Sequence, residues 1–211
     1  MFLTLEGIDG CGKTTQARLL SERLRRSGTA CGDVVWTKEP GGWTGGDKIR
    51  ELVLRDGLEH PLSELFLFLA DRCEHVLQVI APALKEGKTV ICERYTDSTL
   101  AYQSWGRGLP MERIEDLFRW CGFPSPDLTI WIDLPGPAAY HRMVGRGRMD
   151  RLEEEGTVFL EKVRSGFAFL AERDRARIVR IDGDKDIPGI SAEIIDTVLA
   201  FLSRRGKERD C

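Results

Sequence analysis

The sequence predicts an α/β fold of three layers, in which helices flank a five-stranded parallel sheet on both sides. Short apolar runs alternate along the chain with longer segments of helical spacing, which is typical of a doubly wound domain. Several of the runs are nearly continuous and rich in Val and Ile, as strands buried on both faces of a parallel sheet are. A chain of 211 residues suits one domain with a sizeable core. We therefore expect a single domain over residues 1–211.

Each expected strand is a short apolar run, and each is followed by a turn or by a segment of helical spacing. The strands are expected near 2–6 (FLTLE), 33–37 (DVVWT), 88–93 (KTVICE), 128–133 (LTIWID) and 177–182 (RIVRID). The helices are expected over 13–26, 45–56, 62–85, 111–121, 153–174 and 189–204. A left-handed helix cap favours glycine, and four of these helices should end at Gly28, Gly57, Gly87 and Gly122.

Composition argues against two kinds of partner. The formal net charge of −3 does not favour nucleic acid, because a phosphate backbone needs a concentrated positive surface. The most apolar run, residues 65–70, is far too short to span a bilayer, and no secretory signal is visible. The six cysteines are scattered without a C-x-x-C pair, which favours reduced thiols in the cytosol. We expect a cytoplasmic protein without nucleic-acid or membrane partners.

A phosphate-binding motif follows the first strand. In residues 6–15, EGIDGCGKTT, Gly7 and Gly12-Lys13-Thr14 match G-x-x-x-x-G-K-[ST] between a strand and a helix. Glycines let backbone amides turn toward phosphate oxygens, and the helix N-terminus adds positive potential. The motif predicts a P-loop NTPase fold, with Lys13 on the β and γ phosphates of the bound nucleotide and the Thr14 hydroxyl on Mg²⁺. The expected ATP-binding residues are Gly7, Ile8, Asp9, Gly10, Cys11, Gly12, Lys13, Thr14 and Thr15.

Short sequence motifs distinguish the classes of P-loop protein, and two of these motifs are missing from this chain. Guanine-binding switches usually carry N-K-x-D, and this chain has no asparagine. A partitioning ATPase would carry another lysine early in the loop, and residues 7–12 contain none. A kinase of small metabolites is therefore favoured, and such a kinase needs an acceptor site beside the donor site.

A family resemblance supplies that acceptor site. Four segments carry it: TKEPGG (37–42), LFLFLADRCEH (65–75), VICERYTDSTLAYQ (90–103) and GRGRMDRLEEEG (145–156). With the P-loop they resemble the thymidylate kinase family over nearly the whole chain, in the bacterial type whose basic residues come from a lid. The family pattern D-R-[YH]-x-x-S-x-x-A-[YF]-Q is matched by Glu93, Arg94, Tyr95, Ser98, Ala101, Tyr102 and Gln103.

The resemblance implies an ATP-dependent dTMP kinase, which transfers the γ-phosphate of ATP to dTMP and gives dTDP and ADP for dTTP synthesis. It implies Mg²⁺ held by Thr14 and Glu93, a small mobile lid over about 142–155, and a homodimer. The long apolar segment 62–80 is a candidate interface, with simple core packing as an equal alternative. The implied catalytic residues are Lys13, Arg94, Arg146, Arg148 and Arg151. The implied dTMP-binding residues are Asp9, Glu39, Arg50, Phe68, Arg72, Arg94, Ser98, Thr99, Tyr102 and Gln103.

Each residue expected around the base could also have a purely structural role when it is considered alone. Phe68 in an apolar helix would more often be core, and Gln103 would more often be a solvated surface residue. Arg72 lies four positions after Phe68, so both can share one helix face. The resemblance makes Phe68 a stacking platform for thymine, Arg72 a donor to its O4, and Gln103 a partner of N3–H and a neighbouring carbonyl.

Charged residues are expected around the acceptor phosphate and sugar. The resemblance assigns Arg94 and Arg50 to the phosphate, a dianion that demands charge-assisted contacts. Asp9 would hold the sugar 3′-hydroxyl, with a turn aspartate bonded to its own backbone as the alternative. Arg142 and the other lid arginines would resemble an internal arginine finger, or else form a basic surface loop opposite Glu153 and its acidic neighbours.

The sequence departs from the family pattern at several positions. Glu93 replaces an aspartate, so its carboxylate reaches one methylene farther toward the metal. Lys38 replaces an arginine and Trp43 a threonine, Ser104 a glycine and Phe167 a tyrosine. Two other functions stay open: a P-loop kinase of another nucleoside monophosphate or of a deoxynucleoside, and a nucleotide-dependent switch without a small acceptor.

Overall fold

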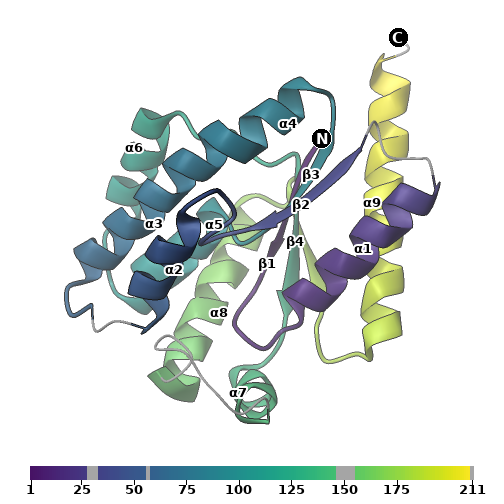
Figure 1. Cartoon of the computed structure of the whole chain (residues 1–211). Coiled ribbons are helices and arrows are strands. Elements are labelled where there is room, and N and C mark those ends of the chain that lie inside the picture. The colour runs from purple at the N-terminus through teal and green to yellow at the C-terminus, as the bar shows by residue number, and fades with distance from the viewer. Residues whose placement is uncertain (28–32, 56–57, 146–154, 210–211) are drawn as a thin grey trace.

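The computed structural model describes residues 1–27, 33–55, 58–145 and 155–209. Within these ranges five parallel strands form one sheet in the order β2-β3-β1-β4-β5 (Figure 1). The strands are β1 (Phe2–Glu6), β2 (Val34–Lys38), β3 (Thr89–Glu93), β4 (Leu128–Asp133) and β5 (Ile178–Asp182). The predicted five-stranded parallel sheet is confirmed, and the bounds of each strand differ from the expected ones by no more than one residue.

Helices cover both faces of the sheet, which confirms the three-layer prediction. Helices α1 (Lys13–Ser27) and α9 (Ile187–Arg209) lie on one face, and α4 (Ala81–Lys85) and α8 (Gly156–Arg173) lie on the other (Figure 1). Between them the two faces bury the core around Leu3, Leu5 and Ile130. The further helices are α2 (Gly46–Arg55), α3 (Pro61–His75), η1 (Val76–Ile80), α5 (Thr96–Thr99), η2 (Leu100–Gly106), α6 (Met111–Cys121) and α7 (Gly136–Val144).

Two helical stretches were not expected from the sequence. Helix α5 continues into the π-helical segment η2, and this stretch buries Ser98, Thr99 and Gln103 as well as apolar residues. A stretch that buries polar and apolar residues together shows no apolar stripe, so its helical period is hidden. Helix α7 begins with Gly136-Pro137, which suggests a turn, although proline is tolerated in the first turn of a helix.

Parallel pairing brings two loops together at the carboxyl edge of the sheet. Leu5 of β1 pairs with Glu93 of β3, so the loops that follow these strands leave the sheet side by side. Open α/β sheets bind ligands at this edge. Gly7 has a φ of 138°, and a Cβ there would lie 2.6 Å from the carbonyl oxygen of Ile132. The close approach requires glycine and packs the loop after β1 directly against β4.

Candidate active site

The loop after β1 closes around the head of Lys13. The Lys13 Nζ donates to the carbonyl oxygens of Gly7 at 3.0 Å and Ile8 at 2.9 Å. The buried ammonium therefore lies over the loop itself, beside the N-terminus of α1. Helix N-termini and inward-facing loop amides bind anions, and a fixed cation adds to that potential.

A cleft opens beside this loop. Seven of the nine residues predicted to bind ATP line it, while Gly7 and Ile8 contribute the carbonyl partners of Lys13. Arg142, expected in the lid, also lines the cleft and donates to the carbonyl oxygen of Gly183 at 3.2 Å. The other lid arginines, Arg146, Arg148 and Arg151, lie outside the described residues.

The cleft has a second wall that the sequence analysis missed. Residues between β5 and the start of α9 form it: Lys185, Asp186, Ile187 and Ile190. Gln16 and Lys38 line the cleft as well. No motif marks these residues, but the segment DGDKD follows the carboxyl end of a predicted strand, and that position is the signal that could have found them.

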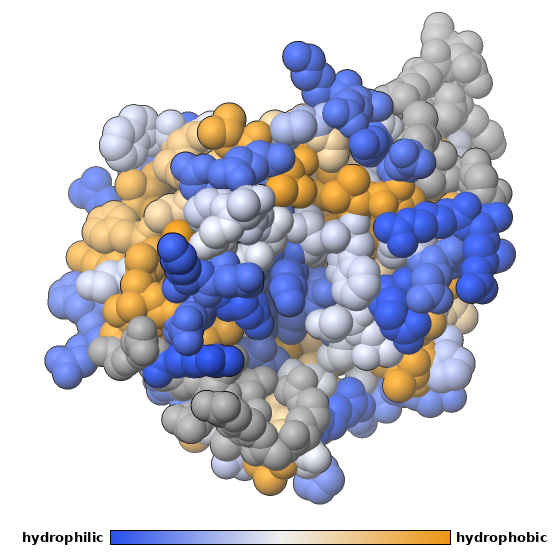
Figure 2. Space-filling view, in the orientation of Figure 1, coloured by the Kyte–Doolittle hydropathy of each residue, from blue (hydrophilic) through white to orange (hydrophobic). Residues whose placement is uncertain are grey.

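A second pocket lies next to the cleft and is lined by twelve residues. All ten residues predicted to bind dTMP are among them, and Pro40 and Leu54 complete the lining. Four residues line both cavities: Asp9, Glu39, Arg50 and Arg94. The space-filling view shows hydrophilic side chains around a hollow in the middle of the face drawn (Figure 2). Two cavities that meet at a pair of arginines suit a reaction between two phosphorylated ligands.

Arg72 is a fully buried cation in the second pocket. Its guanidinium lies 2.7 Å from Oε2 of Glu39 and packs between aromatic rings, with centroids at 5.0 Å for Tyr95, 5.7 Å for Phe118 and 5.6 Å for Phe123. Burial disfavours its charge, but Glu39 outweighs burial and raises the pKa of Arg72. Its Nη1 has no hydrogen-bond partner among the described residues. A buried donor without a partner in a pocket suits a ligand acceptor.

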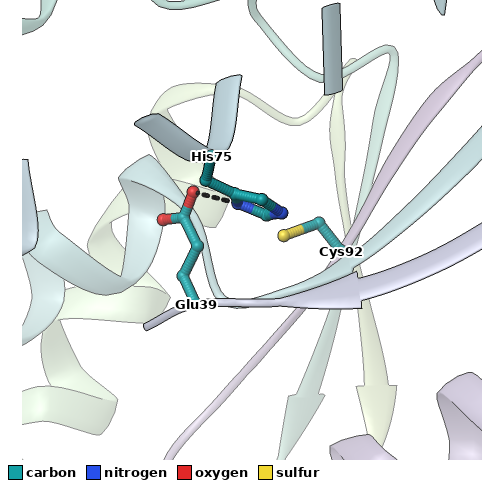
Figure 3. Close-up of side chains that lie close together, drawn as sticks. All are labelled: Glu39, His75 and Cys92. Atoms are coloured by element: carbon teal, nitrogen blue, oxygen red, sulfur yellow. Dashed lines mark hydrogen bonds and ion pairs between the residues drawn. The ribbon is translucent and has the colours of Figure 1, made fainter. Parts of the chain in front are cut away.

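A chain of hydrogen bonds holds Glu39 in place for Arg72. The Nδ1 of His75 lies 2.9 Å from Oε1 of Glu39 (Figure 3). The Nε2 of the same ring lies 2.7 Å from the hydroxyl of Thr37. An ionised carboxylate can only accept, so Nδ1 donates. The ligand atoms of Glu39, His75 and Cys92 lie within 4.8 Å of one another. Since Glu39 and His75 already have partners at both of their polar atoms, the cluster serves to hold Arg72 rather than a metal ion.

Arg94 leaves β3 in a conformation that is rare for its residue type. Its φ of 63° lies in the left-handed region, which costs about 1–2 kcal/mol for a residue with a side chain. From there the guanidinium donates to Asp9, to the hydroxyl of Tyr102 at 3.3 Å and to that of Ser98 at 3.3 Å. Burial disfavours its charge, but Asp9 and Tyr102 raise the pKa of Arg94 well above its usual value. The arginine is therefore a fixed cation between the two cavities.

Glu93 faces the N-terminus of α1. The Thr14 hydroxyl donates to Oε2 of Glu93 at 2.5 Å, and the Trp36 indole donates to Oε1 at 2.9 Å. A hydroxyl and a carboxylate side by side are hard oxygen ligands, which is the donor type that Mg²⁺ prefers. The two residues predicted to hold the metal are thus brought together beside the loop.

Gln103 and Phe167 occupy different environments. Gln103 is buried in η2 and donates from Nε2 to Oε1 of Glu64 at 2.8 Å, which fixes its amide in the pocket wall. Phe167 stacks on Trp131 with centroids 6.3 Å apart and belongs to the core. The loss of a tyrosine hydroxyl at this position therefore falls in the core and not in either cavity.

Comparison with known proteins assigns the chain to a family. A family model described as thymidylate kinase matches residues 5–194. A thymidylate kinase of Synechococcus sp. (strain JA-2-3B'a(2-13)) is 48% identical over 94% of this chain and 94% of its own. One of Pseudomonas fluorescens (strain Pf0-1) is 45% identical over 96% of each chain. The crystal structure of thymidylate kinase from Ehrlichia chaffeensis superposes with a TM-score of 0.75 at 35% identity, covering 94% of this chain and 98% of that one. The chain therefore belongs to the thymidylate kinase family.

Proposed function

We propose that this protein is an ATP-dependent kinase of dTMP, which forms dTDP and ADP and so serves dTTP synthesis. The observation that carries the proposal is the second pocket. There the buried Arg72 presents Nη1 without a partner among the described residues, in a cavity that adjoins the P-loop cleft. A donor-only group at that place selects a base with a carbonyl rather than an amino group.

For the donor nucleotide, the P-loop is the proposed binding site. Lys13 would turn from the carbonyl oxygens of Gly7 and Ile8 to the β and γ phosphates, while the loop amides bind the phosphate oxygens. The apolar Ile187 and Ile190 on the opposite wall suit the base of ATP. Phosphoryl transfer requires mainly positioning and charge neutralisation, and this wall and loop supply both.

For dTMP, the residues lining the second pocket divide by chemistry. Phe68 would stack on thymine, Arg72 would donate to O4, and the Gln103 amide would meet N3–H. Arg50 and Arg94 would bind the phosphate that accepts the γ-phosphoryl group. Asp9, Glu39, Ser98, Thr99 and Tyr102 complete the proposed acceptor site, in which Glu39 acts by holding Arg72.

Magnesium is the proposed cofactor. The adjacent oxygens of Thr14 and Glu93 fit a hard cation, and both residues face the P-loop cleft. Bound Mg²⁺ would neutralise charge on the β and γ phosphate oxygens. Glu93 and Thr14 would orient it, and the proton of the Thr14 hydroxyl stays directed at Glu93.

Three further features are proposed from the sequence. The chain forms one kinase domain, a lid over about 142–155 brings Arg146, Arg148 and Arg151 to the transferring phosphate, and the protein works in the cytoplasm. Among the described helices, none is long and apolar enough to cross a membrane. The thiols of Cys11, Cys73, Cys92 and Cys121 are free, which agrees with a reducing compartment.

A homodimer through the α3 side of the molecule is also proposed. Phe66 on α3 is 54% exposed and Leu77 on η1 is 68% exposed, and both lie in the segment expected at the interface. Figure 2 shows apolar surface on the left of the view, the side on which Figure 1 places α3. Sedimentation of the pure protein tests this: a dimer mass supports it, and a monomer mass independent of concentration rejects it.

The decisive experiment measures dTDP formed from dTMP, ATP and Mg²⁺ by the purified protein. A panel of dTMP, dUMP, dCMP and AMP separates the proposal from a kinase of another nucleotide. Preference for dCMP or AMP would reject dTMP as the substrate. Nucleotide binding without acceptor-stimulated ADP release would indicate a switch instead.

A further inference from the structure

Trp36, Lys38 and Glu93 share one face of the sheet. Residues two apart in a strand point to the same side, and in the parallel pairing of β2 with β3 Lys38 lies opposite Glu93. Helix α1 packs on this face and begins beside Glu93, so Thr14 reaches the same place. The edge strand β2 thus brings an indole to the carboxylate that faces the P-loop.

Both oxygens of Glu93 have hydrogen-bond donors. The Trp36 Nε1 lies 2.9 Å from Oε1, and the Thr14 Oγ1 lies 2.5 Å from Oε2. An indole nitrogen can only donate, so the direction of this contact is fixed. Glu93 is buried, while Trp36 is 37% exposed. One oxygen is therefore anchored from the outer strand, and the other is presented to the P-loop.

The anchor matters because the side chain is a glutamate. The family pattern has the shorter aspartate here, and the additional methylene adds a rotatable bond and carries the carboxylate farther from the strand. Each bond that must be fixed costs conformational entropy. We propose that the Trp36 indole N–H sets the position of the Glu93 carboxylate against Thr14, which makes Trp36 a positioning residue for the metal side of phosphoryl transfer. This inference rests on the proposed function.

The chain contains a matched control for the experiment. Trp43 also donates its indole N–H to a carboxylate, Oδ1 of Asp71, at 2.8 Å. Asp71 accepts in addition from the backbone N–H of Gly41 at 3.0 Å, so this pair holds the turn after β2. Trp43 and Asp71 make no hydrogen bond with Thr14 or Glu93 within the described part of the chain. Both indoles line the cavity that Thr14 and Glu93 also line, so tryptophan to phenylalanine removes the same group in the same surroundings, and only at Trp36 does it remove a hydrogen bond to Glu93.

The test measures metal binding directly. Electron paramagnetic resonance follows the binding of Mn²⁺ to the protein with a non-hydrolysable ATP analogue. Trp36→Phe should weaken Mn²⁺ binding about tenfold, since a hydrogen bond to a charged group is lost, while Trp43→Phe should leave it unchanged. In steady-state assays Trp36→Phe should need more Mg²⁺ for half-maximal rate, with KM for dTMP unchanged. Unchanged Mn²⁺ affinity in folded Trp36→Phe, or equal weakening in Trp43→Phe, overturns the inference.

A double-mutant cycle sharpens the test. Glu93→Asp withdraws the carboxylate from Trp36, so Trp36→Phe should then cause little further loss of Mn²⁺ affinity. If Trp36→Phe lowers Mn²⁺ affinity equally in the unsubstituted protein and in Glu93→Asp, Trp36 does not act through the Glu93 carboxylate. Should Trp36→Phe fail to fold by circular dichroism, benzothienylalanine at position 36 keeps the ring shape and lacks the N–H. If the unsubstituted protein makes no dTDP, the proposed function fails, while the Mn²⁺ comparison still decides the role of Trp36.

Discussion

The Tyr102 hydroxyl donates a 2.7 Å hydrogen bond to Oδ2 of Asp9 and so joins η2 to the P-loop. Arg94 donates to the other oxygen of the same carboxylate and lies 4.9 Å from the centroid of the Tyr102 ring. Burial opposes ionisation of Asp9, but Arg94, Lys13 and the Tyr102 hydroxyl outweigh burial and lower its pKa to about 2. The carboxylate is therefore charged at neutral pH, and it orients Arg94 before any substrate binds.

Removal of the Tyr102 hydroxyl should weaken this arrangement. We expect Tyr102→Phe to lower kcat/KM for dTMP by at least about tenfold, because a hydrogen bond to a charged group contributes roughly 1.5–3 kcal/mol. Tyr140→Phe is the matched control, since Tyr140 lies partly buried against the core on α7. Steady-state kinetics of both variants check the prediction. A similar loss in the two would mean that the hydroxyl of Tyr102 has no special role.

Lys13→Met should abolish most of the turnover and leave the fold intact. The loop amides remain, but the β and γ phosphates lose a mobile cation, so kcat should fall by orders of magnitude. The bonds from Lys13 to Gly7 and Ile8 are also lost, so a thermal melt must accompany the kinetics. Lys85→Met, at an exposed position at the end of α4, should behave like the unsubstituted protein. Retained turnover in folded Lys13→Met would contradict the proposed role.

Arg72→Ala should reduce the preference for dTMP over dCMP. Arg72 can only donate, so it favours the carbonyl at position 4 of thymine and opposes the amino group of cytosine. The mutant should therefore lose kcat/KM mainly with dTMP. Phe68→Leu serves as the comparison, because stacking does not distinguish the two bases and both values should fall together. Proportional losses in Arg72→Ala would instead indicate that Arg72 only supports α3.

Glu6 should make stability depend on pH. This carboxyl lies at the end of β1, fully buried, where it accepts from the backbone N–H of Tyr95 at 2.7 Å and from the hydroxyl of Ser98. Burial, with a smaller contribution from Asp97, raises its pKa from 4.5 to about 7. The folded state then binds the proton more tightly than the unfolded state, so this contribution to stability is full below pH 4.5 and is lost as pH rises through about 7.

Glu6→Gln isolates the effect, because the amide cannot titrate. The unfolding free energy of the unsubstituted protein, relative to that of Glu6→Gln, should fall by an amount on the order of 1–3 kcal/mol as the pH increases from 5 to 8. The difference between the two Tm values, measured over the same pH range, checks this fall. Glu22→Gln on the exposed face of α1 is the control and should track the unsubstituted protein. A difference curve that stays flat over this range would show that Glu6 is ionised in the folded protein at every pH tested.

The sheet and the P-loop could be predicted because their signals are local. Each strand is a continuous apolar run, and the glycines of the loop follow directly after the first of them. Phe68 and Gln103 were different: their own patterns favoured a core residue and a surface residue. Only the family resemblance placed them in the acceptor site, and in the structure both line the same pocket.

Contacts between distant residues could not be predicted. Nothing in the sequence links Arg72 to Glu39, which lie 33 positions apart, or Trp36 to Glu93, which lie 57 apart. The wall formed by Lys185 to Ile190 also lacked a motif, because its contribution depends on where the last strand ends in space. Contacts of this kind depend on the order of the strands in the sheet, and the pattern of apolar residues along the sequence does not reveal that order.

At Arg94 the backbone and the side chain have opposite effects on stability, because the left-handed φ is strained while the guanidinium is paired. Glycine would adopt this conformation without steric cost, but Arg94→Gly would also leave the charged Asp9 carboxylate without its cation. Such a variant would lose the guanidinium that sits between the two cavities. Variants selected for heat resistance and variants selected for turnover should therefore both retain arginine here, together with its strained backbone.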